Sequence, residues 1–290
     1  MKRSISLAAA ALLFACGGGD GTDRAVIQNK GSDTLLNVAQ AWAEVYSQEH
    51  ANVAVAVTGG GSGTGISAMI NGTVDIANSS RTMRESEYEA ARGNGVEPVE
   101  FIVGFDALAV YMHEDNPIQQ MSIQQLKDIY ADGGPTETWS ALGVEVPGCG
   151  SDEIVRVSRQ NNSGTYVYFR EAVLGEDVDY KLGSRDMHGS KDVVDLVVNT
   201  PCAIGYSGLA YATPEVHMPC VTAEEGGACV MPSVDTAIDG TYPIARPLMM
   251  YTAGQPEGAV KEYMDWVLSD EGQCLILEQG YAPVREVTCA

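Results

Sequence analysis

The sequence predicts an α/β protein in which helices cover a largely parallel β-sheet. Short runs of β-branched and alanine residues alternate along the chain with segments whose apolar residues recur every three or four positions. The first pattern is typical of buried strands and the second of amphipathic helices. Their alternation favours parallel strands joined by helical crossovers. The 290 residues, 45% of them hydrophobic, exclude a disordered chain and suffice for two such domains.

The first expected helix covers residues 34–50, where six apolar side chains between Leu35 and Tyr46 have helical spacing. A second helix begins at Ile66, after a glycine cluster. Further helices are expected at residues 122–130, 165–173, 191–199 and 259–268, the last with Trp266 on its apolar face. Strands are expected at residues 53–57, 74–77, 101–112, 154–158 and 203–207, the first of them as a buried strand.

The charge of the chain excludes one class of function. Lysine and arginine number 17 against 39 acidic residues, which gives a formal net charge of −22. A nucleic-acid-binding protein needs a basic surface, so no nucleic-acid partner is expected. The same acidity argues against direct binding to anionic membranes.

The N-terminus has the features of an export signal. Two basic residues precede an apolar stretch at residues 5–15, which is shorter than the roughly 18 residues of a membrane span. Residues 13–16 resemble a bacterial lipoprotein box ending in Cys16, although Phe14 replaces the usual small residue. We therefore expect a signal peptide at residues 1–15 and a lipidated tether at residues 16–24. The protein is then an exported lipoprotein, periplasmic or on the cell surface, and loss of Lys2 and Arg3 changes its net charge from −22 to −24.

Six further cysteines fit an oxidising compartment and three disulfides. Six cysteines allow 15 pairings, and the sequence leaves them open. Local closure, the pairing of cysteines that lie close together in the sequence, favours Cys220–Cys229 and Cys274–Cys289. This leaves Cys149–Cys202 as the third pair. No C-x-x-C pair is present and the four histidines are scattered, so no metal site is expected.

Three segments rich in glycine and hydroxyl residues, at positions 31–34, 59–65 and 161–165, each join a strand to a helix. Helix starts carry unpaired N–H groups, glycine lets an anion approach the backbone, and serine or threonine adds a neutral donor. Each segment alone is more often an ordinary cap or turn. Three together, in a chain with few cations, favour an oxyanion site.

Two arginines and one aspartate add to this pattern. Arg159 ends a strand four residues before Ser163, and Arg81 follows another strand. A guanidinium suits a tetrahedral oxyanion, but each arginine is alternatively a partner of one of the many acids. Asp106 interrupts an apolar run, and a buried acid needs a partner. It either pairs with an arginine or accepts the proton of hydrogen phosphate, which would disfavour sulfate.

The glycine segment at positions 59–65 does not match the enzyme motifs that it resembles. A phosphate-binding P-loop needs Lys and then Ser or Thr where Ile66 and Ser67 stand, and a dinucleotide fingerprint also needs glycine at position 66. A serine nucleophile elbow, Gly-x-Ser-x-Gly, needs glycine where Thr64 stands. No histidine has a persuasive catalytic context. We expect no catalytic residue and no cofactor.

The segments, in this order, resemble the phosphate-binding lipoproteins of bacterial phosphate-specific ABC transporters. The resemblance covers residues 30–283 and is carried by Gly31-Ser32-Asp33-Thr34-Leu35, Gly60-Gly61-Ser62-Gly63-Thr64, Ser79-Ser80-Arg81, Asp106-Ala107-Leu108-Ala109-Val110, Asn162-Ser163-Gly164-Thr165-Tyr166, Ile204-Gly205-Tyr206-Ser207-Gly208 and Tyr242-Pro243-Ile244-Ala245-Arg246-Pro247-Leu248. It implies a type II periplasmic-binding-protein fold, with two α/β lobes joined by two crossovers. Lobe I is expected at residues 25–106 and 246–290, and lobe II at residues 107–245. The expected partners are inorganic phosphate and a membrane permease, and the protein is expected to be a monomer.

The resemblance also implies the ligand contacts. Thr34 and Ser62 supply hydroxyl donors, and Leu35 supplies its amide. The second lobe contributes Ser163, Gly164, Thr165 and the charged donor Arg159. Ser32, Arg81 and Asp106 are further candidates.

One position departs from the family pattern. A well-known branch has an aspartate where Ser80 stands, and that aspartate accepts the phosphate proton. Here Ser80 donates, and the acceptor role falls to Asp106 or Asp33, although Asp33 is expected to be a plain helix cap. Sulfate, molybdate or tungstate therefore remain alternative ligands, and a phosphatase-type hydrolase or a structural role are less favoured alternatives.

Overall fold

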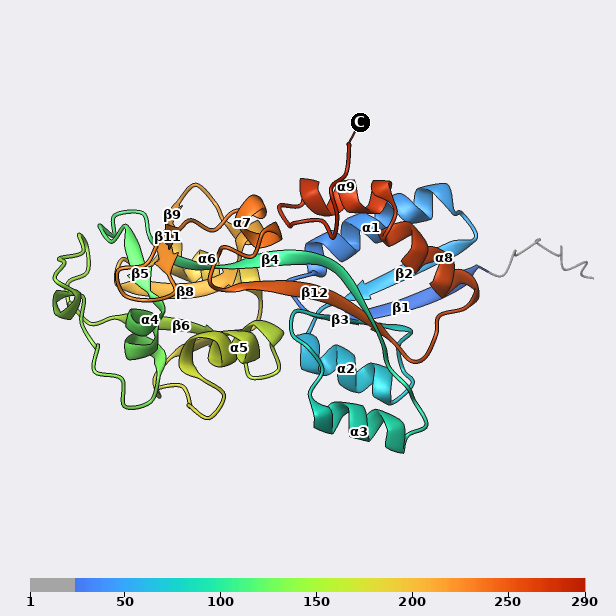
Figure 1. Cartoon of the computed structure of the whole chain (residues 1–290), viewed down its shortest axis with the longest axis horizontal. Helices are drawn as coiled ribbons and strands as arrows, with labels where there is room; N and C mark the ends of the chain where they lie inside the picture. The colour runs from blue at the N-terminus through green and yellow to red at the C-terminus, as the bar shows by residue number, and fades with distance from the viewer. Residues whose placement is uncertain (1–23, 290) are drawn as a thin grey trace, which may run out of the picture.

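The computed structural model describes residues 24–289 and shows two lobes connected by two long strands (Figure 1). Within these residues the main sheet has the strand order β2 (Val53–Thr58), β1 (Ala25–Gly31), β3 (Ile76–Ser79), β12 (Ala245–Thr252), β4 (Val99–His113), β8 (Ala203–Gly208), β6 (Val155–Arg159) and β7 (Arg185–Met187), and β9 (Val216–His217) pairs with β4. The strands that pass between the lobes are β4 (Val99–His113) and β12 (Ala245–Thr252). A predicted signal peptide and the predicted lipid site at Cys16 lie outside the described residues.

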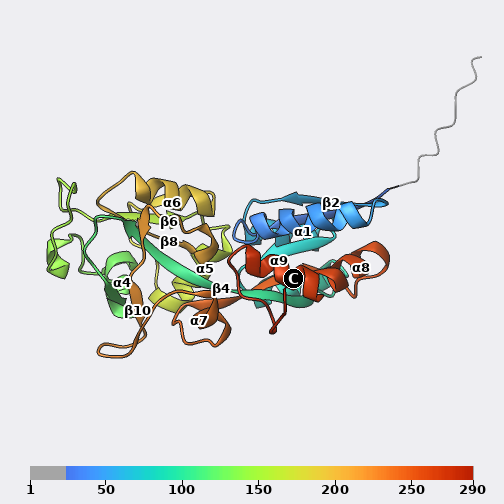
Figure 2. The same ribbon diagram turned by 90° about the horizontal axis from the view of Figure 1, so that it is seen from above.

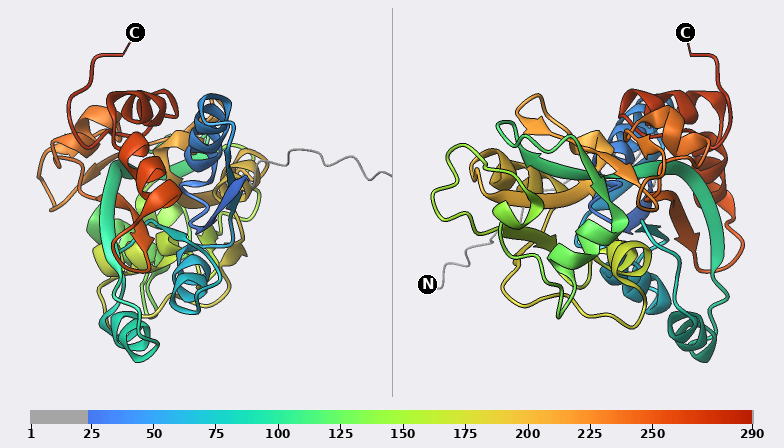
Figure 3. Two further views of the ribbon diagram at one scale, coloured as in Figure 1. Left: turned by 90° about the vertical axis from the view of Figure 1, so that its right-hand side faces the viewer. Right: turned by 60° about the vertical axis from the view of Figure 1, so that its left-hand side comes forward.

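The first lobe combines the beginning and the end of the chain. Its elements are β1 (Ala25–Gly31), α1 (Leu36–Glu49), β2 (Val53–Thr58), α2 (Ser62–Ile70), β3 (Ile76–Ser79), α3 (Glu85–Gly93), α8 (Gly258–Val267) and α9 (Asp270–Glu278). Figures 1 and 3 show α2 and α3 on one side of this sheet and α1, α8 and α9 on the other. Trp42, Tyr46 and Tyr263 pack in the core beneath α1 and α8.

The second lobe holds the middle of the chain, at the other end of the molecule (Figure 2). Its elements are β5 (Gln120–Ser122), α4 (Ile123–Tyr130), β6 (Val155–Arg159), α5 (Gly164–Phe169), β7 (Arg185–Met187), α6 (Ser190–Val198), β8 (Ala203–Gly208), β9 (Val216–His217), β10 (Cys220–Thr222), β11 (Cys229–Val230) and α7 (Val234–Ile238). Short helical turns lie at Ser140–Leu142, Arg170–Leu174 and Leu209–Tyr211. In its core the rings of Phe169 and Tyr206 stack, and Tyr130 meets both of them edge-on.

The prediction of a largely parallel sheet is correct for the pairs of the main sheet that do not involve β4 or β12, and wrong for every pair of these two strands, which are antiparallel. β1 runs parallel to β2 and β3, and β6 runs parallel to β7 and β8. The strands β4 and β12 pair antiparallel with each other, because one leaves the first lobe and the other returns to it. In their register Ala245 lies opposite Ala107, and Arg246 opposite Asp106.

The predicted helices and strands are present, with shifted ends. The strand expected at residues 74–77 lies at Ile76–Ser79, and the helix expected at residues 165–173 ends at Phe169 and continues as a π-helical turn. The strand β2 is at an edge of the sheet and mostly half-buried, so the prediction of a buried strand is wrong. Among the described residues, no helix has the length and apolar content needed to cross a membrane.

The two disulfides favoured by local closure are confirmed, and so is the third pair that they leave. They join Cys149 to Cys202, Cys220 to Cys229, and Cys274 to Cys289. The second of them ties β10 to β11, which form a small sheet with β5.

We expect the Cys220→Ser/Cys229→Ser variant to lose about 2.5 kcal/mol of unfolding free energy, because the cross-link restricts the unfolded chain over a short loop. The two cysteines are separated by 9 positions in the sequence. Denaturant titrations of the variant and the wild type, both with the other disulfides oxidised, measure this difference. Equal midpoints with equal slopes would contradict the expectation.

Candidate functional site

The three hydroxyl and glycine segments meet where the two lobes face each other. The first lobe contributes the end of β1 with the start of α1, the start of α2, and the end of β3. The second lobe contributes the start of α5, directly after β6. Their hydroxyl side chains are almost fully buried, with 0–2% exposed at Thr34, Ser62, Ser80, Ser163 and Thr165. Distant segments of the sequence therefore form one enclosed cluster of neutral donors.

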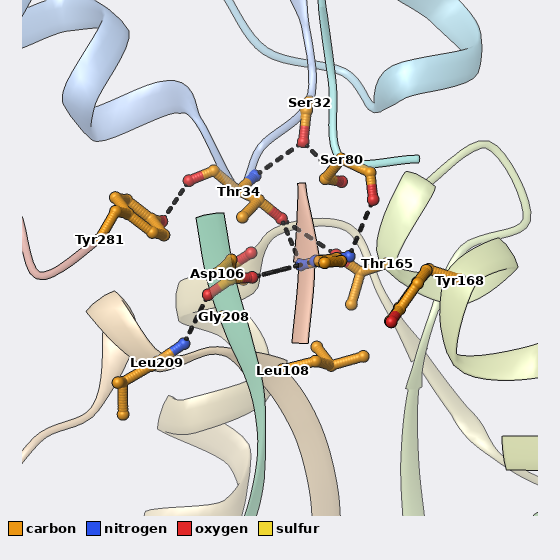
Figure 4. Close-up of polar contacts among 12 residues, drawn as sticks. Ser32, Thr34, Ser80, Asp106, Leu108, Thr165, Tyr168, Gly208, Leu209 and Tyr281 are labelled. Atoms are coloured by element: carbon orange, nitrogen blue, oxygen red, sulfur yellow. Dashed lines mark hydrogen bonds and ion pairs between the residues drawn. The ribbon is translucent and has the colours of Figure 1, made fainter. Parts of the chain in front are cut away.

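Direct contacts across the lobes hold this cluster together. The hydroxyl oxygens of Thr34 and Thr165 are 3.0 Å apart (Figure 4). At Gly164, an added Cβ would lie 2.3 Å from Ser62 Oγ and 2.6 Å from Ser80 Oγ. Only glycine allows the second-lobe backbone to approach the two serine hydroxyls this closely.

A hydrogen-bond chain orders the hydroxyls of the first lobe. The Thr34 amide donates to Ser32 Oγ at 3.2 Å, and the Ser32 hydroxyl donates to Ser80 Oγ at 2.9 Å (Figure 4). The Ser80 amide donates to Ser62 Oγ at 3.1 Å. Leu35 immediately precedes α1 and is buried, so the predicted backbone donor lies beside Thr34 at the helix start.

Ser163 is the N-terminal cap of α5 on the opposite side. Its Oγ accepts a hydrogen bond from the Thr165 amide at 3.2 Å. The Ser163 hydroxyl keeps its own hydrogen for donation to another acceptor. The structure thus brings Ser163, Gly164 and Thr165 to the cluster, as the sequence predicts.

The glycine-rich segment of the first lobe closes over the second-lobe segment. The Gly63 amide donates to the Asn162 carbonyl at 3.0 Å, and the Asn162 side-chain amide donates to the Gly60 carbonyl at 3.0 Å. Gly61 has a φ of 89°, and an added Cβ there would lie 2.6 Å from the Asn162 carbonyl oxygen. Glycine is therefore required at Gly61 by both conformation and space.

Arg159 is buried beside the cluster and reaches both lobes. Its guanidinium donates to Ser190 Oγ at 2.9 Å and to the His188 carbonyl at 2.8 Å in the second lobe. It also pairs with Asp33 of the first lobe at 3.2 Å. Burial lowers the pKa of the Arg159 guanidinium, and the Asp33 carboxylate opposes this effect.

The expectation that Asp33 is a plain helix cap is wrong. Its side chain makes no capping bond to α1; one oxygen accepts the Gly60 amide at 3.0 Å and the other faces Arg159. A carboxylate prefers these donors because one of them is a buried cation that needs a counter-charge. Asp33 thus joins the glycine segment to the second lobe.

Arg246 is the residue that sequence reasoning missed. It lies in the segment 242–248, which carries the resemblance, and no role was assigned to it. Its Nε and Nη2 pair with Asp106 Oδ2 at 3.0 and 2.7 Å. Nη1 donates to the Ser80 carbonyl at 3.2 Å, and Nη2 also donates to Thr34 Oγ1 at 3.3 Å. The Arg246 guanidinium therefore contacts the donor cluster directly, at Ser80 and Thr34.

Asp106 takes the first of its two predicted roles, an ion pair with an arginine. Its other oxygen accepts the Leu209 amide at 3.1 Å (Figure 4). Burial raises the pKa of Asp106, and the Arg246 guanidinium acts in the opposite direction. The role of Asp106 as a proton acceptor stays a prediction.

Arg81 is buried, but its guanidinium donates hydrogen bonds to groups outside the hydroxyl cluster. Its guanidinium makes a two-pronged pair with Glu87, at 2.7 and 2.8 Å, and also donates to the Thr82 carbonyl. The alternative in which Arg81 pairs with an acid is confirmed. Ser79, which sequence reasoning gave no role, accepts from the Arg81 amide.

The formal charges at the cluster balance. Arg159 pairs with Asp33, and Arg246 pairs with Asp106. The remaining polar groups are neutral hydroxyls and backbone amides whose dipoles can point at an anion. No group of acidic, histidine or cysteine side chains that could hold a metal ion is found among residues 24–289.

The chain is similar to one family model and to known proteins along most of its length. A family model described as a PBP superfamily domain matches residues 18–271. The chain is 33% identical to the phosphate-binding protein PstS of Pseudomonas aeruginosa over 89% of this chain and 83% of that protein. It is 32% identical to protein SphX of Synechococcus elongatus over 90% of this chain and 78% of that protein.

Two solved structures have the same fold. One, from Clostridium perfringens, is assigned as a phosphate ABC transporter substrate-binding protein and contains bound phosphate. It is 25% identical with a TM-score of 0.78, and the match covers 90% of this chain and 100% of that one. An ABC-type phosphate transport receptor from Vibrio cholerae is 27% identical with a TM-score of 0.69, and the match covers 88% and 99% of the two chains.

Proposed function

This chain belongs to the PstS phosphate-binding proteins of the PBP superfamily, and we propose that it binds one inorganic phosphate ion between its lobes and delivers it to an ABC transporter permease. As a member of this family it is a solute-binding protein and not an enzyme. The single observation that carries the ligand assignment is the enclosed cluster of hydroxyl donors from both lobes, centred on Thr34 and Thr165.

The donors of the cluster are sufficient for tight binding. Each hydrogen bond to a charged group contributes roughly 1.5–3 kcal/mol. The proposed donors are Thr34, Leu35, Ser62, Ser80, Arg159, Ser163, Gly164 and Thr165. Several such bonds together exceed the approximately 8 kcal/mol of micromolar affinity before the losses from ordering and desolvation. Oriented short-range dipoles therefore provide the binding free energy.

The net charge of −22 does not oppose this proposal at short range. Repulsion between the acidic surface and free phosphate is screened over about 8–10 Å at physiological salt. Inside the cluster the two aspartates are already paired with arginines. The anion therefore meets a locally neutral environment.

The division of the chain follows from the same proposal. We assign residues 25–106 and 246–290 to lobe I and residues 107–245 to lobe II, with bending at residues 105–108 and 244–248. The pairing of β4 supports this division, because up to Ala107 it pairs with β12 and from Leu108 it pairs with β8. Export to the periplasm or cell surface, lipidation at Cys16 and a monomeric state complete the proposal.

Titration calorimetry and thermal unfolding with phosphate test the ligand. We expect a dissociation constant of micromolar or below, and a stabilisation of about 2.7 kcal/mol at a phosphate concentration 100 times that constant. Parallel titrations with sulfate, molybdate and tungstate serve as controls. A response to one of these anions with none to phosphate would overturn the ligand assignment.

Sulfate is the second candidate because both carboxylates at the cluster are already occupied by N–H donors. An acceptor-only carboxylate repels sulfate, and its pairing with an arginine weakens that repulsion. Competition between phosphate and sulfate at pH 6 and pH 8 separates the two, because only phosphate changes its protonation in this range.

A further inference from the structure

We propose that Arg246 is a positioning residue that fixes the Thr34 hydroxyl as a hydrogen-bond donor toward phosphate. The proposal rests on the function proposed above and adds a residue to it. Arg246 lies on β12, and its side chain is fully buried. Its hydrogen-bond partners are Asp106, Ser80 and Thr34.

The direction of the Arg246–Thr34 hydrogen bond carries the argument. A guanidinium has five N–H donors and no acceptor, so Thr34 Oγ1 must accept the bond at 3.3 Å. A hydroxyl oxygen that accepts on one side turns its hydrogen away from that donor. The other polar neighbour of Thr34 Oγ1 is Thr165 Oγ1, 3.0 Å away across the lobes (Figure 4). The Thr34 hydrogen is thereby turned away from Arg246 and toward the second lobe, where Thr165 is its neighbour.

The guanidinium is held rigidly enough to impose this direction. Asp106 binds it through both Nε and Nη2, and the Ser80 carbonyl binds Nη1. Tyr168 from α5 lies with its ring centroid 5.6 Å from the guanidinium carbon. Each of the three nitrogens thus has a fixed acceptor, and a planar fork held in this way cannot rotate without losing several bonds.

Asp106 in turn ties the pair to the second lobe. Its second oxygen accepts the Leu209 amide, which follows β8. A Cβ added at Gly208 would lie 3.1 Å from that carboxylate, so the backbone packs closely on it. The Arg246–Asp106 pair therefore connects the Thr34 hydroxyl, the two long strands and the second lobe in one network.

A double-mutant cycle on phosphate affinity tests the proposal. Thr34→Val removes the hydroxyl and keeps the side-chain shape. Arg246→Lys keeps the positive charge and removes the planar guanidinium with its several N–H donors. We expect Arg246→Lys to weaken phosphate binding about tenfold or more in the wild-type background. In the Thr34→Val background the same change is expected to weaken binding less than about threefold. Equal losses in both backgrounds, or a wild-type affinity for Arg246→Lys, would overturn it.

Two further variants separate positioning from folding. Arg156→Lys changes an arginine that pairs with Glu137 outside the cluster, and its phosphate affinity is expected to be unchanged. If Arg246→Lys does not fold, Asp106→Asn/Arg246→Gln replaces both charges of the buried pair, so that no unpaired charge remains. The same non-additivity with Thr34→Val is expected. Failure of the wild type to bind phosphate would refute the function itself, whereas binding with an additive cycle would refute only the role of Arg246.

Discussion

The Gly164→Ala variant is expected to bind phosphate about a thousandfold more weakly than the wild type and to retain its fold. A methyl group at this position would lie 2.3 Å from Ser62 Oγ and 2.6 Å from Ser80 Oγ. The second-lobe segment would have to move away, and two or more charge-assisted hydrogen bonds would lengthen together. At roughly 1.5–3 kcal/mol for each bond, this loss corresponds to about three orders of magnitude in affinity.

Calorimetry with phosphate measures the affinity of Gly164→Ala, and circular dichroism checks the fold. Gly150→Ala is the matched control in the same lobe, because an added Cβ there has no neighbour within 4 Å. The control is expected to bind as the wild type does. An unchanged affinity for Gly164→Ala would show that the anion does not require the contact between this backbone and the two serines.

The Arg159→Gln variant is expected to lose both stability and phosphate affinity. Removing one partner of a buried ion pair destabilises by roughly 3–5 kcal/mol, because the Asp33 carboxylate remains buried without its counter-charge. Asp33 has 8% of its side chain exposed, so little water can replace the guanidinium. Phosphate binding is expected to weaken about a thousandfold, through loss of the charged donor and of the interlobe pair.

The double variant Asp33→Asn/Arg159→Gln distinguishes these two effects. Replacing both charges removes the unpaired carboxylate, so denaturant unfolding is expected to show most of the lost stability restored. Phosphate affinity measured by calorimetry is expected to stay low, because the guanidinium is still missing. Recovery of affinity together with stability would mean that Arg159 only supports the fold.

Local signals in the sequence account for much of this protein. The positions of six helices and five strands followed from spacing that spans only a few residues, which short-range geometry determines. The hydroxyl and glycine segments, and with them Thr34, Ser62 and the segment from Ser163 to Thr165, came from the same kind of pattern, whereas Ser80 came from the family resemblance. Local closure correctly favoured two of the disulfides and left the third pair.

The choice of partners for the buried charges was decided only by the tertiary structure. Arg246 is 140 residues from Asp106, and Arg159 is 126 residues from Asp33. Each acid could have paired with any arginine until strand register and lobe packing placed one beside it. The register of β4 against β12 put Arg246 opposite Asp106. The approach of the lobes turned Asp33 from an expected cap into the partner of Arg159, because a buried cation needs a counter-charge more than a helix end needs a cap.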